Sequence, residues 1–406
     1  MPLAVAPSTP EYVPDEVVVK FEDRLDASAR TALAVAAGAQ WKESGYNAHF
    51  DVLRVPAGRV LPTIAALQQR GGVVYAEPNY LLHASGTPSD TYFSPYQWNF
   101  YDYGVASNGV PSNFGVQMQT ATNVSTGTGT VVAIVDTGVA YENNGRYAQA
   151  PDLAGQTFVS PWNFVKGTSH ANDDNGHGTH VCGTIAERTN NSTGCAGIAC
   201  NAAIMPVKVL DSRGSGTLTN VANGIRYAAD NFASVINLSL GASAGSSTLQ
   251  SAVDYAWGKG CVLCAATGNG GNGSISYPAA YTNCIAVGAT RFDGARASYS
   301  QYGPGIDVVA PGGDTNVDQN GDGYGDGILQ QTFQGNPKSF GYYFFNGTSM
   351  ATPHVSAIAA LVLAAHPGYS NVNVRAAIEG TCKDLGVAGY DATFGWGLVN
   401  AALAVQ

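Results

Sequence analysis

Residues 130–138 read TVVAIVDTG, an apolar run that ends in a carboxylate, Asp136. Comparable apolar runs recur along the rest of the chain, separated by stretches of helical spacing; they cover residues 203–209, 235–240, 262–266 and 285–287. Strands that are apolar on both faces and alternate with helices are typical of a parallel sheet covered by helices on both sides. The sequence therefore predicts an α/β fold with a doubly wound, mostly parallel sheet. In such sheets ligands bind beyond the carboxyl ends of the strands, which is where Asp136 is expected.

The chain before residue 91 is organised differently. Short runs alternate there between two types, strand-like at 17–21, 50–55 and 73–76 and helical at 27–37 and 61–69. This strand–helix–strand–helix–strand order predicts a small α+β domain. The predicted boundaries are a tail at 1–14, the small domain at 15–83, a polar linker at 84–90 and the large domain at 91–406.

Composition limits the possible functions. The 406 residues suggest two domains, since one domain typically has about 150 residues. Lys and Arg total 19 and Asp and Glu total 29, so the net charge is −10, and this acidic balance disfavours nucleic acid and anionic membranes as partners. Hydrophobic residues make up 45%, which excludes disorder, yet no apolar stretch reaches the roughly 20 residues that cross a membrane. These features suit an extracellular enzyme. Residues 1–14 do not resemble a secretory signal, so either the protein is cytosolic or a signal has been removed.

The seven cysteines leave two interpretations open. An odd number implies at least one unpaired thiol. Cys195 with Cys200, and Cys261 with Cys284, are possible disulfides. Alternatively, several cysteines lie among Val, Ile and Ala and are buried as small hydrophobic residues; these are Cys182, Cys261, Cys264 and Cys284. No pair of cysteines repeats at zinc-binding spacing, so structural zinc is not expected.

Three motifs carry the chemistry of peptide-bond hydrolysis. Asp136 ends its strand, residues 174–180 (DNGHGTH) place His177 before a helix, and residues 346–354 (NGTSMATPH) place Ser349 at the start of an apolar helix. A serine becomes nucleophilic when an imidazole takes its proton, and a buried carboxylate fixes that imidazole. Each residue alone could be a turn or cap residue, but together they predict a catalytic triad. His180 and His354 are expected to be structural.

From about residue 90 to the C-terminus, the chain resembles the subtilisin family of serine endopeptidases, and within it the thermitase branch. The resemblance rests on the three motifs and on residues 265–270, AATGNG. It implies a subtilisin-like fold in which Asp136, His177 and Ser349 form the triad. It also implies that Asn269 donates its side-chain amide to the oxyanion, beside the Ser349 backbone N–H.

The same resemblance implies a substrate cleft. A peptide would add as an extra strand between two edge segments and place its P1 side chain, which is expected to be large and mostly apolar, in a first pocket. The edge segments are Gly214, Ser215 and Gly216, and Ser239, Leu240 and Gly241; the pocket is walled by Ala266, Thr267 and Gly268, with Ser276 near its floor.

The small domain resembles the inhibitory propeptide of this family, a ferredoxin-like α+β domain, and ends in residues 77–80, EPNY. This resemblance implies a zymogen. The propeptide would assist folding, occupy the cleft and be removed autocatalytically by a cut between residues 80 and 90. An unrelated small binding domain is the alternative.

Two structural calcium sites are expected. Residues 318–326, DQNGDGYGD, match the first part of an EF-hand loop, but Leu329 stands where that loop needs Glu, so Asp314 would complete the set. The expected ligands of this site are Asp314, Asp318, Asn320, Asp322 and Asp326. A solvated acidic loop is the alternative.

The second site is implied by the resemblance to the thermitase branch of the family. Residues at matching positions are Asp90, Asp152, Asn191 and Thr193. A further thermitase-type site is not expected, because Asn163 and Lys166 replace its acidic ligands.

The sequence thus predicts a secreted, monomeric, calcium-stabilised serine endopeptidase of broad specificity, made as a zymogen that acts on proteins and peptides. Two alternatives remain open. An acid-active serine-carboxyl peptidase would use Glu in place of His177. A catalytically inactive binding or inhibitor protein is disfavoured by the complete set of Asp136, His177, Ser349 and Asn269.

Overall fold

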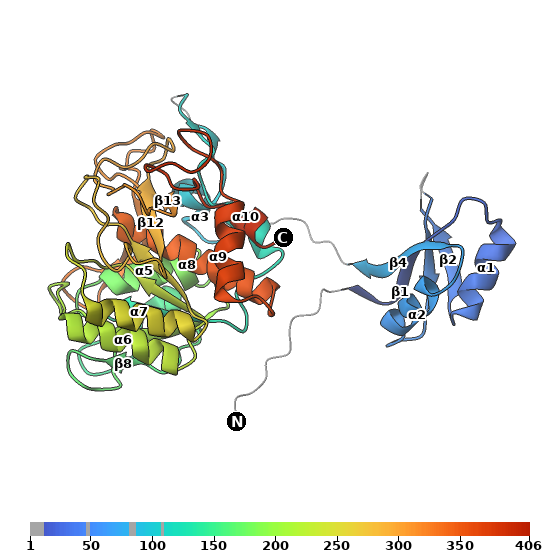
Figure 1. Cartoon of the computed structure of the whole chain (residues 1–406), viewed down its shortest axis with the longest axis horizontal. Coiled ribbons are helices and arrows are strands. Elements are labelled where there is room, and N and C mark those ends of the chain that lie inside the picture. The colour runs from blue at the N-terminus through green and yellow to red at the C-terminus, as the bar shows by residue number, and fades with distance from the viewer. Residues whose placement is uncertain (1–11, 46–48, 81–86, 107–108) are drawn as a thin grey trace. The chain divides into compact units, whose positions relative to one another are not determined.

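The computed structural model describes residues 12–45, 49–80, 87–106 and 109–406. The chain divides into two compact units, Met1–Ala84 and Ser85–Gln406 (Figure 1). The division falls inside the predicted linker. Part of the predicted processing segment, residues 81–86, lies outside the described residues, as does most of the predicted tail.

Unit 1 is a four-stranded antiparallel sheet with two helices. Its described elements are β1 Tyr12–Phe21, α1 Ala27–Ala36, β2 Gln40–Ser44, β3 Asp51–Arg54, α2 Val60–Gln68 and β4 Val73–Tyr80. The strands are ordered β2-β3-β1-β4, so β1, the first strand in sequence, is central. Alternate residues of β1 (Val17, Val19, Phe21) are buried and form the core with residues of both helices.

The sequence prediction for unit 1 lacked one strand. It missed β2, residues QWKES, which has no buried residue, and Trp41 in it is 55% exposed. An edge strand of this kind shows no apolar alternation and is formed by pairing with β3. Residues 12–14 of the predicted tail also belong to β1.

Unit 2 contains a parallel sheet of seven strands in the order β13-β12-β11-β10-β7-β9-β8. The described helices of unit 2 are α3 Phe93–Tyr96, η1 Trp98–Phe100, α4 Met118–Thr122, η2 Pro151–Leu153, α5 His177–Ala186, α6 Leu218–Asp230, α7 Ser247–Gly258, α8 Thr348–Ala365, α9 Asn371–Gly380 and α10 Ala401–Ala404. The described strands are β5 Gly104–Val105, β6 Pro111–Ser112, β7 Val131–Asp136, β8 Trp162–Asn163, β9 Ala203–Lys208, β10 Val235–Leu238, β11 Val262–Ala266, β12 Ile285–Thr290, β13 Val308–Pro311, β14 Ile328–Phe333 and β15 Phe340–Phe345.

Helices cover both faces of this sheet, which confirms the doubly wound prediction. Along β11, Val262 and Cys264 join one core cluster with residues of α5 and α8, whereas Leu263 and Ala265 join the other with α6 and α7. Helices α6 and α7 lie side by side on their face of the sheet (Figure 1). Because all seven strands are parallel, their carboxyl ends meet at one edge.

Among the described residues, one helix is long and apolar enough to cross a membrane, α8 at residues 348–365. About four fifths of it (78%) is buried inside unit 2, where it packs under the sheet as a core helix. The hairpin of β14 and β15 was not predicted, because β14 buries polar residues such as Gln330 and Gln331.

The disulfide pairings considered for Cys195 with Cys200 and for Cys261 with Cys284 are not formed, and all seven cysteines are free. The Cys261 thiol instead donates to the carbonyl of Ala233. The alternative interpretation holds for four cysteines that are buried as small hydrophobic residues, namely Cys182, Cys261, Cys264 and Cys284.

Candidate active site

Asp136 and His177 form a hydrogen-bonded pair at the carboxyl edge of the sheet. Asp136 is the last residue of β7 and is fully buried, and His177 is the first residue of α5. The imidazole Nδ1–H donates to Asp136 Oδ1 at 2.8 Å, and the backbone N–H of Thr137 donates to the same oxygen at 2.6 Å. Glycine at 178 permits this approach, because a Cβ there would lie 2.1 Å from the carbonyl oxygen of Gly138.

The environment of His177 acts on its pKa in opposite directions. Burial lowers the pKa of this imidazole, but the charge of Asp136 and its hydrogen bond raise it, with a smaller contribution from Asp173, and the net shift is upward. Its side chain remains 26% exposed, so the ring can be reached from the pocket beside it. The pair can therefore accept a proton and hold it as an imidazolium.

Ser349 lies near the start of α8, close to His177. One pocket of about 330 Å³ is lined by both residues together with Asn269, Phe344, Phe345, Asn346 and Met350. In this structure the Ser349 hydroxyl donates to the carbonyl of Ser239 at 3.2 Å, not to His177. The Ser239 hydroxyl in turn donates to the carbonyl of Ser349 at 2.8 Å, so the residue that follows β10 is bonded to α8 at Ser349.

Asn269 is held by the residue before Ser349. Its Oδ1 accepts hydrogen bonds from the backbone N–H and from the hydroxyl of Thr348, both at 2.9 Å. These two hydrogen bonds fix the orientation of the Asn269 amide, with Oδ1 toward Thr348, and leave Nδ2 as the donor for a ligand in the pocket. Thr348 was not singled out from the sequence, although it lies within the NGTSMATPH motif.

A second pocket, of about 580 Å³, also has His177 in its lining. It is lined by both predicted edge segments, Gly214, Ser215 and Gly216 and Ser239, Leu240 and Gly241. Apolar side chains complete the lining, among them Leu210, Val221 and Leu249. The structure therefore brings the two segments to one cleft beside the imidazole.

Gln301, which the sequence did not reveal, lies against the residues predicted to form the P1 pocket. Ala266 and Thr267 are buried, and Gly268 and Ser276 lie against the Gln301 amide: a Cβ on Gly268 would be 2.1 Å from Gln301 Oε1, and Ser276 Oγ is 3.4 Å from the same oxygen. Gln301 also accepts from the backbone N–H of residue 270 at 3.1 Å. Because Gln301 is more than 30 residues from Gly268 in sequence, only the fold brings it here.

His180 and His354 are structural, as predicted. His180 is buried, and its Nε2–H donates to the carbonyls of Ile328 and Tyr343, both at 3.0 Å. Burial lowers the pKa of His180 to about 3, so this imidazole is neutral. His354 is also buried and bonds to the side chain of Asn99 at 2.8 Å.

The predicted calcium ligands that follow the thermitase resemblance are brought together. Asn191 connects the two carboxylates: its N–H lies 3.5 Å from Asp90 Oδ1, and its Nδ2 donates to Asp152 Oδ1 at 3.0 Å. Thr193 N–H donates to Asn191 Oδ1 at 2.8 Å. Burial raises the pKa of Asp90 and of Asp152. Neither has a cationic side chain within ion-pair distance among the residues that the structure describes.

In the EF-hand-like group, the loop side chains mostly bond to their own backbone. Asp318, Asn320 and Asp322 accept from amides two to five residues later in the chain. Asp314 accepts likewise, and its N–H donates to the Asp326 carbonyl at 2.9 Å. Asp326 is 2% exposed; burial, followed by the charges of Asp318 and Asp322, raises its pKa to about 7.

Within the described ranges, no three His, Cys, Asp or Glu side chains converge as they would at a metal centre built from those groups alone. Both candidate sites would therefore need amide and carbonyl oxygens as well.

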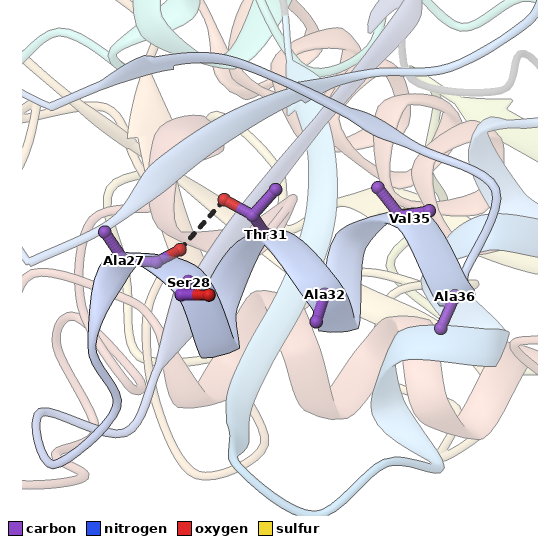
Figure 2. Close-up of a pocket in the computed structure, with 6 residues that line it drawn as sticks. All are labelled: Ala27, Ser28, Thr31, Ala32, Val35 and Ala36. Atoms are coloured by element: carbon purple, nitrogen blue, oxygen red, sulfur yellow. Dashed lines mark hydrogen bonds between the residues drawn. The ribbon is translucent and has the colours of Figure 1, made fainter.

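In unit 1, a shallow open hollow lies over the outer face of α1, lined by small or hydroxyl side chains and Val35, where Thr31 donates to the Ala27 carbonyl at 2.8 Å (Figure 2). It contains no titratable group, so it offers no catalytic chemistry.

A serine, a buried Asp–His pair and an amide at the carboxyl edge of a doubly wound sheet define the class of serine hydrolases. Comparison with known proteins narrows the class. Residues 127–397 match the Subtilase family, and residues 2–79 match the Fervidolysin N-terminal prodomain. The chain belongs to the subtilase family, and it is a subtilisin-like serine endopeptidase with an N-terminal prodomain.

Its similarity to individual proteins agrees with this assignment. It is 41% identical to "Thermophilic serine proteinase" of Bacillus sp. (strain AK1), covering 97% of this chain and 88% of that one. It is 45% identical to "Thermitase" of Thermoactinomyces vulgaris, covering 79% and 99%. Among solved structures it resembles a protease of Pseudoalteromonas arctica PAMC 21717, with 32% identity, a TM-score of 0.68, and coverage of 79% and 99%. These matches disagree with the three alternatives that the sequence left open. Those were an acid-active serine-carboxyl peptidase, a catalytically inactive protein of the same fold, and an N-terminal domain unrelated to a propeptide.

Proposed function

We propose that Ser349 is the nucleophile, His177 the general base and Asp136 the carboxylate that orients it. The observation that carries the proposal is the 2.8 Å hydrogen bond between Asp136 and His177, together with the pocket that His177 lines with Ser349 and Asn269. When substrate enters, the Ser349 hydroxyl turns from the Ser239 carbonyl to His177 Nε2. His177 then takes the hydroxyl proton as Ser349 Oγ attacks the peptide carbonyl, and gives it to the leaving amine as the C–N bond breaks and an acyl-enzyme forms on Ser349. Water then attacks the acyl-enzyme, with His177 taking a proton from the water and returning it to Ser349 Oγ, which frees the acid product.

The negative charge that develops on the peptide oxygen needs donors already in place. Asn269 Nδ2 and the backbone N–H of Ser349 would supply them, and the N-terminus of α8 adds its positive dipole end. The support for Asn269 is that both Thr348 donors bind its oxygen, which leaves the amide nitrogen to face the oxyanion.

The substrate is proposed to lie as an extended strand between residues 214–216 and 239–241, with its P1 side chain toward Gly268 and Ser276. Glycines at positions such as 214 and 241 allow a peptide backbone to approach closely, and backbone hydrogen bonds are insensitive to side-chain sequence, which supports broad specificity. The Gln301 amide, which lies against Gly268 and Ser276, would make this pocket narrower and more polar than expected for the large, mostly apolar P1 side chain that the sequence predicts.

We also propose that unit 1 acts as an inhibitory propeptide, cut autocatalytically between residues 80 and 90, and that the protein is secreted and monomeric. The match of residues 2–79 to a prodomain supports the first point. The low charge fraction, 12%, is consistent with secretion.

Calcium is proposed as a structural ligand at both acidic regions. The residues fit a hard cation, because Asp90 and Asp152 are buried, their pKa values are raised by burial, and Asp326 Oδ1 is buried without a hydrogen bond. Asp90, Asp152, Asn191 and the Thr193 carbonyl would hold one ion, and Asp326 with its loop the other. Bound calcium would neutralise these carboxylates; it has no part in the chemical steps.

The test of the nucleophile is Ser349→Ala in the full chain. The variant should remain folded but should neither cut itself between residues 80 and 90 nor hydrolyse casein. Processing at the wild-type rate in the purified variant would disprove the assignment of the nucleophile.

A further inference from the structure

A second buried carboxylate, Asp173, lies beneath the Asp136–His177 pair. It belongs to the loop before α5 and is only 1% exposed. Its oxygens accept five hydrogen bonds from the two segments that carry the pair: from Thr137 Oγ1 (2.9 Å), Asn175 N (2.9 Å), Gly176 N (3.0 Å), Thr179 N (2.9 Å) and Thr179 Oγ1 (2.7 Å). A buried carboxylate is tolerated as an ion when its oxygens are satisfied in this way. The network is therefore complete without a ligand.

Thr137 connects the two segments through one hydroxyl. It directly follows Asp136 at the end of β7 and is fully buried. Its Oγ1 donates to Asp173 and accepts from the backbone N–H of Gly178 at 2.9 Å. Gly178 directly follows His177, as Thr137 directly follows Asp136. The hydrogen bond between Thr137 and Gly178 therefore connects the two chain segments right beside the Asp136–His177 pair.

The adjacent carboxylate of the same loop is anchored separately. Lys208, the last residue of β9, is 1% exposed, and its ammonium donates to Asp174 Oδ1 (2.7 Å) and to the carbonyls of Thr137 (2.6 Å) and Leu210 (2.7 Å). Three ammonium protons thus meet three acceptors. The loop that carries Asp173 and Asp174 is therefore bonded to the sheet twice near Thr137, through the Thr137 hydroxyl and through the Lys208 ammonium.

We propose that Asp173 and Thr137 are positioning residues, which lock the start of α5 to the end of β7 and thereby hold His177 at bonding distance from Asp136 during the reaction. This inference rests on the roles proposed above for the triad. Its physical basis is that the imidazole must keep one geometry as it gains and then loses a proton. A misplacement of about 1 Å can cost about 10²-fold in rate.

The test compares three substitutions of threonine in the processed enzyme. Thr137→Val removes the hydroxyl and keeps the shape; it should lower kcat by about 10²-fold and leave KM nearly unchanged. Thr137→Ser keeps the hydroxyl and should restore most of kcat. Thr130→Val is the matched control, because Thr130 precedes the same strand at its other end and its hydroxyl donates to the Gly127 carbonyl at 2.6 Å. It should leave kcat unchanged.

The proposal is wrong if Thr137→Val lowers the thermal midpoint as Thr130→Val does but keeps the wild-type kcat. Should Thr137→Val not fold, Thr137→Ala removes the same hydroxyl without adding a methyl group in its place. A double-mutant cycle with Asp173→Asn is a second, independent test: the losses in kcat should be strongly non-additive, and additive losses would contradict a shared network. Each kcat is expressed as a ratio to the kcat of an active wild type. A result that contradicts the positioning role of Thr137 therefore leaves the assignment of Ser349 as the nucleophile untouched.

Discussion

The carboxyl edge of the sheet and the two acidic regions of unit 2 both bury carboxylates, but they satisfy the charge differently. At the edge, Asp136 bonds to His177, Asp173 accepts five hydrogen bonds, and Asp174 pairs with Lys208. Each of these carboxylates has a partner within the protein, although Asp136 Oδ2 is buried without a hydrogen bond of its own. The Asp136–His177 pair is therefore preorganised and its geometry does not depend on a bound ligand, whereas the Ser349 hydroxyl still has to turn from the Ser239 carbonyl.

In the acidic regions, the buried carboxylates have raised pKa values and form no ion pair in the described part of the chain, although Arg291 acts on Asp326 from a longer distance; they are Asp90, Asp152 and Asp326. Asp90 and Asp152 accept hydrogen bonds, at 2.8 Å from the N–H of Asn190 and at 2.9 Å from the N–H of Cys195, but burial still raises the pKa of both carboxyls, so a bound cation would stabilise their ionised form. We therefore expect that removing calcium weakens the fold, whereas removing a charge at the edge of the sheet stops the chemistry.

The greatest loss of activity among the following variants is expected from Asp136→Asn. An amide in this place leaves the fold intact but favours the wrong tautomer of His177, and the same change in a serine protease of unrelated fold lowers kcat by about 10⁴-fold. The measurement is kcat on a peptide anilide, with circular dichroism as the control for folding. A loss below tenfold would show that Asp136 does not orient the base.

The same substitution should alter the pH profile. His177 must be neutral to act, and its pKa is raised above the ordinary histidine value, so kcat/KM of the wild type should fall with decreasing pH from a midpoint above about 6.5. Because Asp136 stabilises the imidazolium, Asp136→Asn should move this midpoint to lower pH. An unchanged or higher midpoint would contradict the attribution of the shift to Asp136.

Next in size is Asn269→Ala. Loss of one oxyanion donor typically costs about 10²–10³-fold in kcat with little change in KM. Thr348→Ser is a useful companion, since it keeps the hydroxyl that holds Asn269 Oδ1 and should stay near the wild-type rate. Equal kcat in wild type and Asn269→Ala would remove Asn269 from the oxyanion site.

Calcium removal tests the acidic regions in the same way. A ligand that binds only the folded state stabilises it, by about 4 kcal/mol when its free concentration is about 1,000 times its Kd. EDTA should therefore lower the thermal midpoint by several degrees. Asp90→Asn and Asp326→Asn, measured separately with and without calcium, should each reduce the dependence on calcium. A midpoint unaffected by EDTA in the wild type would remove both sites.

The mildest change is expected from Gln301→Ala. Removing the amide that lies against Gly268 and Ser276 enlarges the proposed first pocket. The ratio of kcat/KM for substrates with P1 Phe over P1 Ala should rise about tenfold, as pocket changes of this size allow. A constant ratio would place Gln301 outside the pocket.

How far the sequence predicts this molecule depends on how local each feature is. Five of the seven strands of the parallel sheet are apolar runs that the sequence predicts, whereas the two outermost strands, β8 with two residues and β13 with four, were missed. The three motifs carry Asp136, His177 and Ser349 with their neighbours, so the centre of the sheet and the pair could be predicted. The contribution of Gln301 could not, because it depends on which distant loop packs beside Gly268. Asp173 was visible next to Asp174, but nothing in sequence distinguishes a carboxylate satisfied by five donors from a solvated one.

Labelling with a fluorophosphonate, followed by mass spectrometry of the digested protein, tests the preorganised site with the fewest assumptions. Reaction with this reagent requires an activated serine beside a working base and oxyanion site. The structure predicts a single adduct, on the peptide that contains Ser349, and its loss in His177→Ala. No adduct in the processed protein, or an adduct on another serine, would contradict the assignment of Ser349 as the nucleophile.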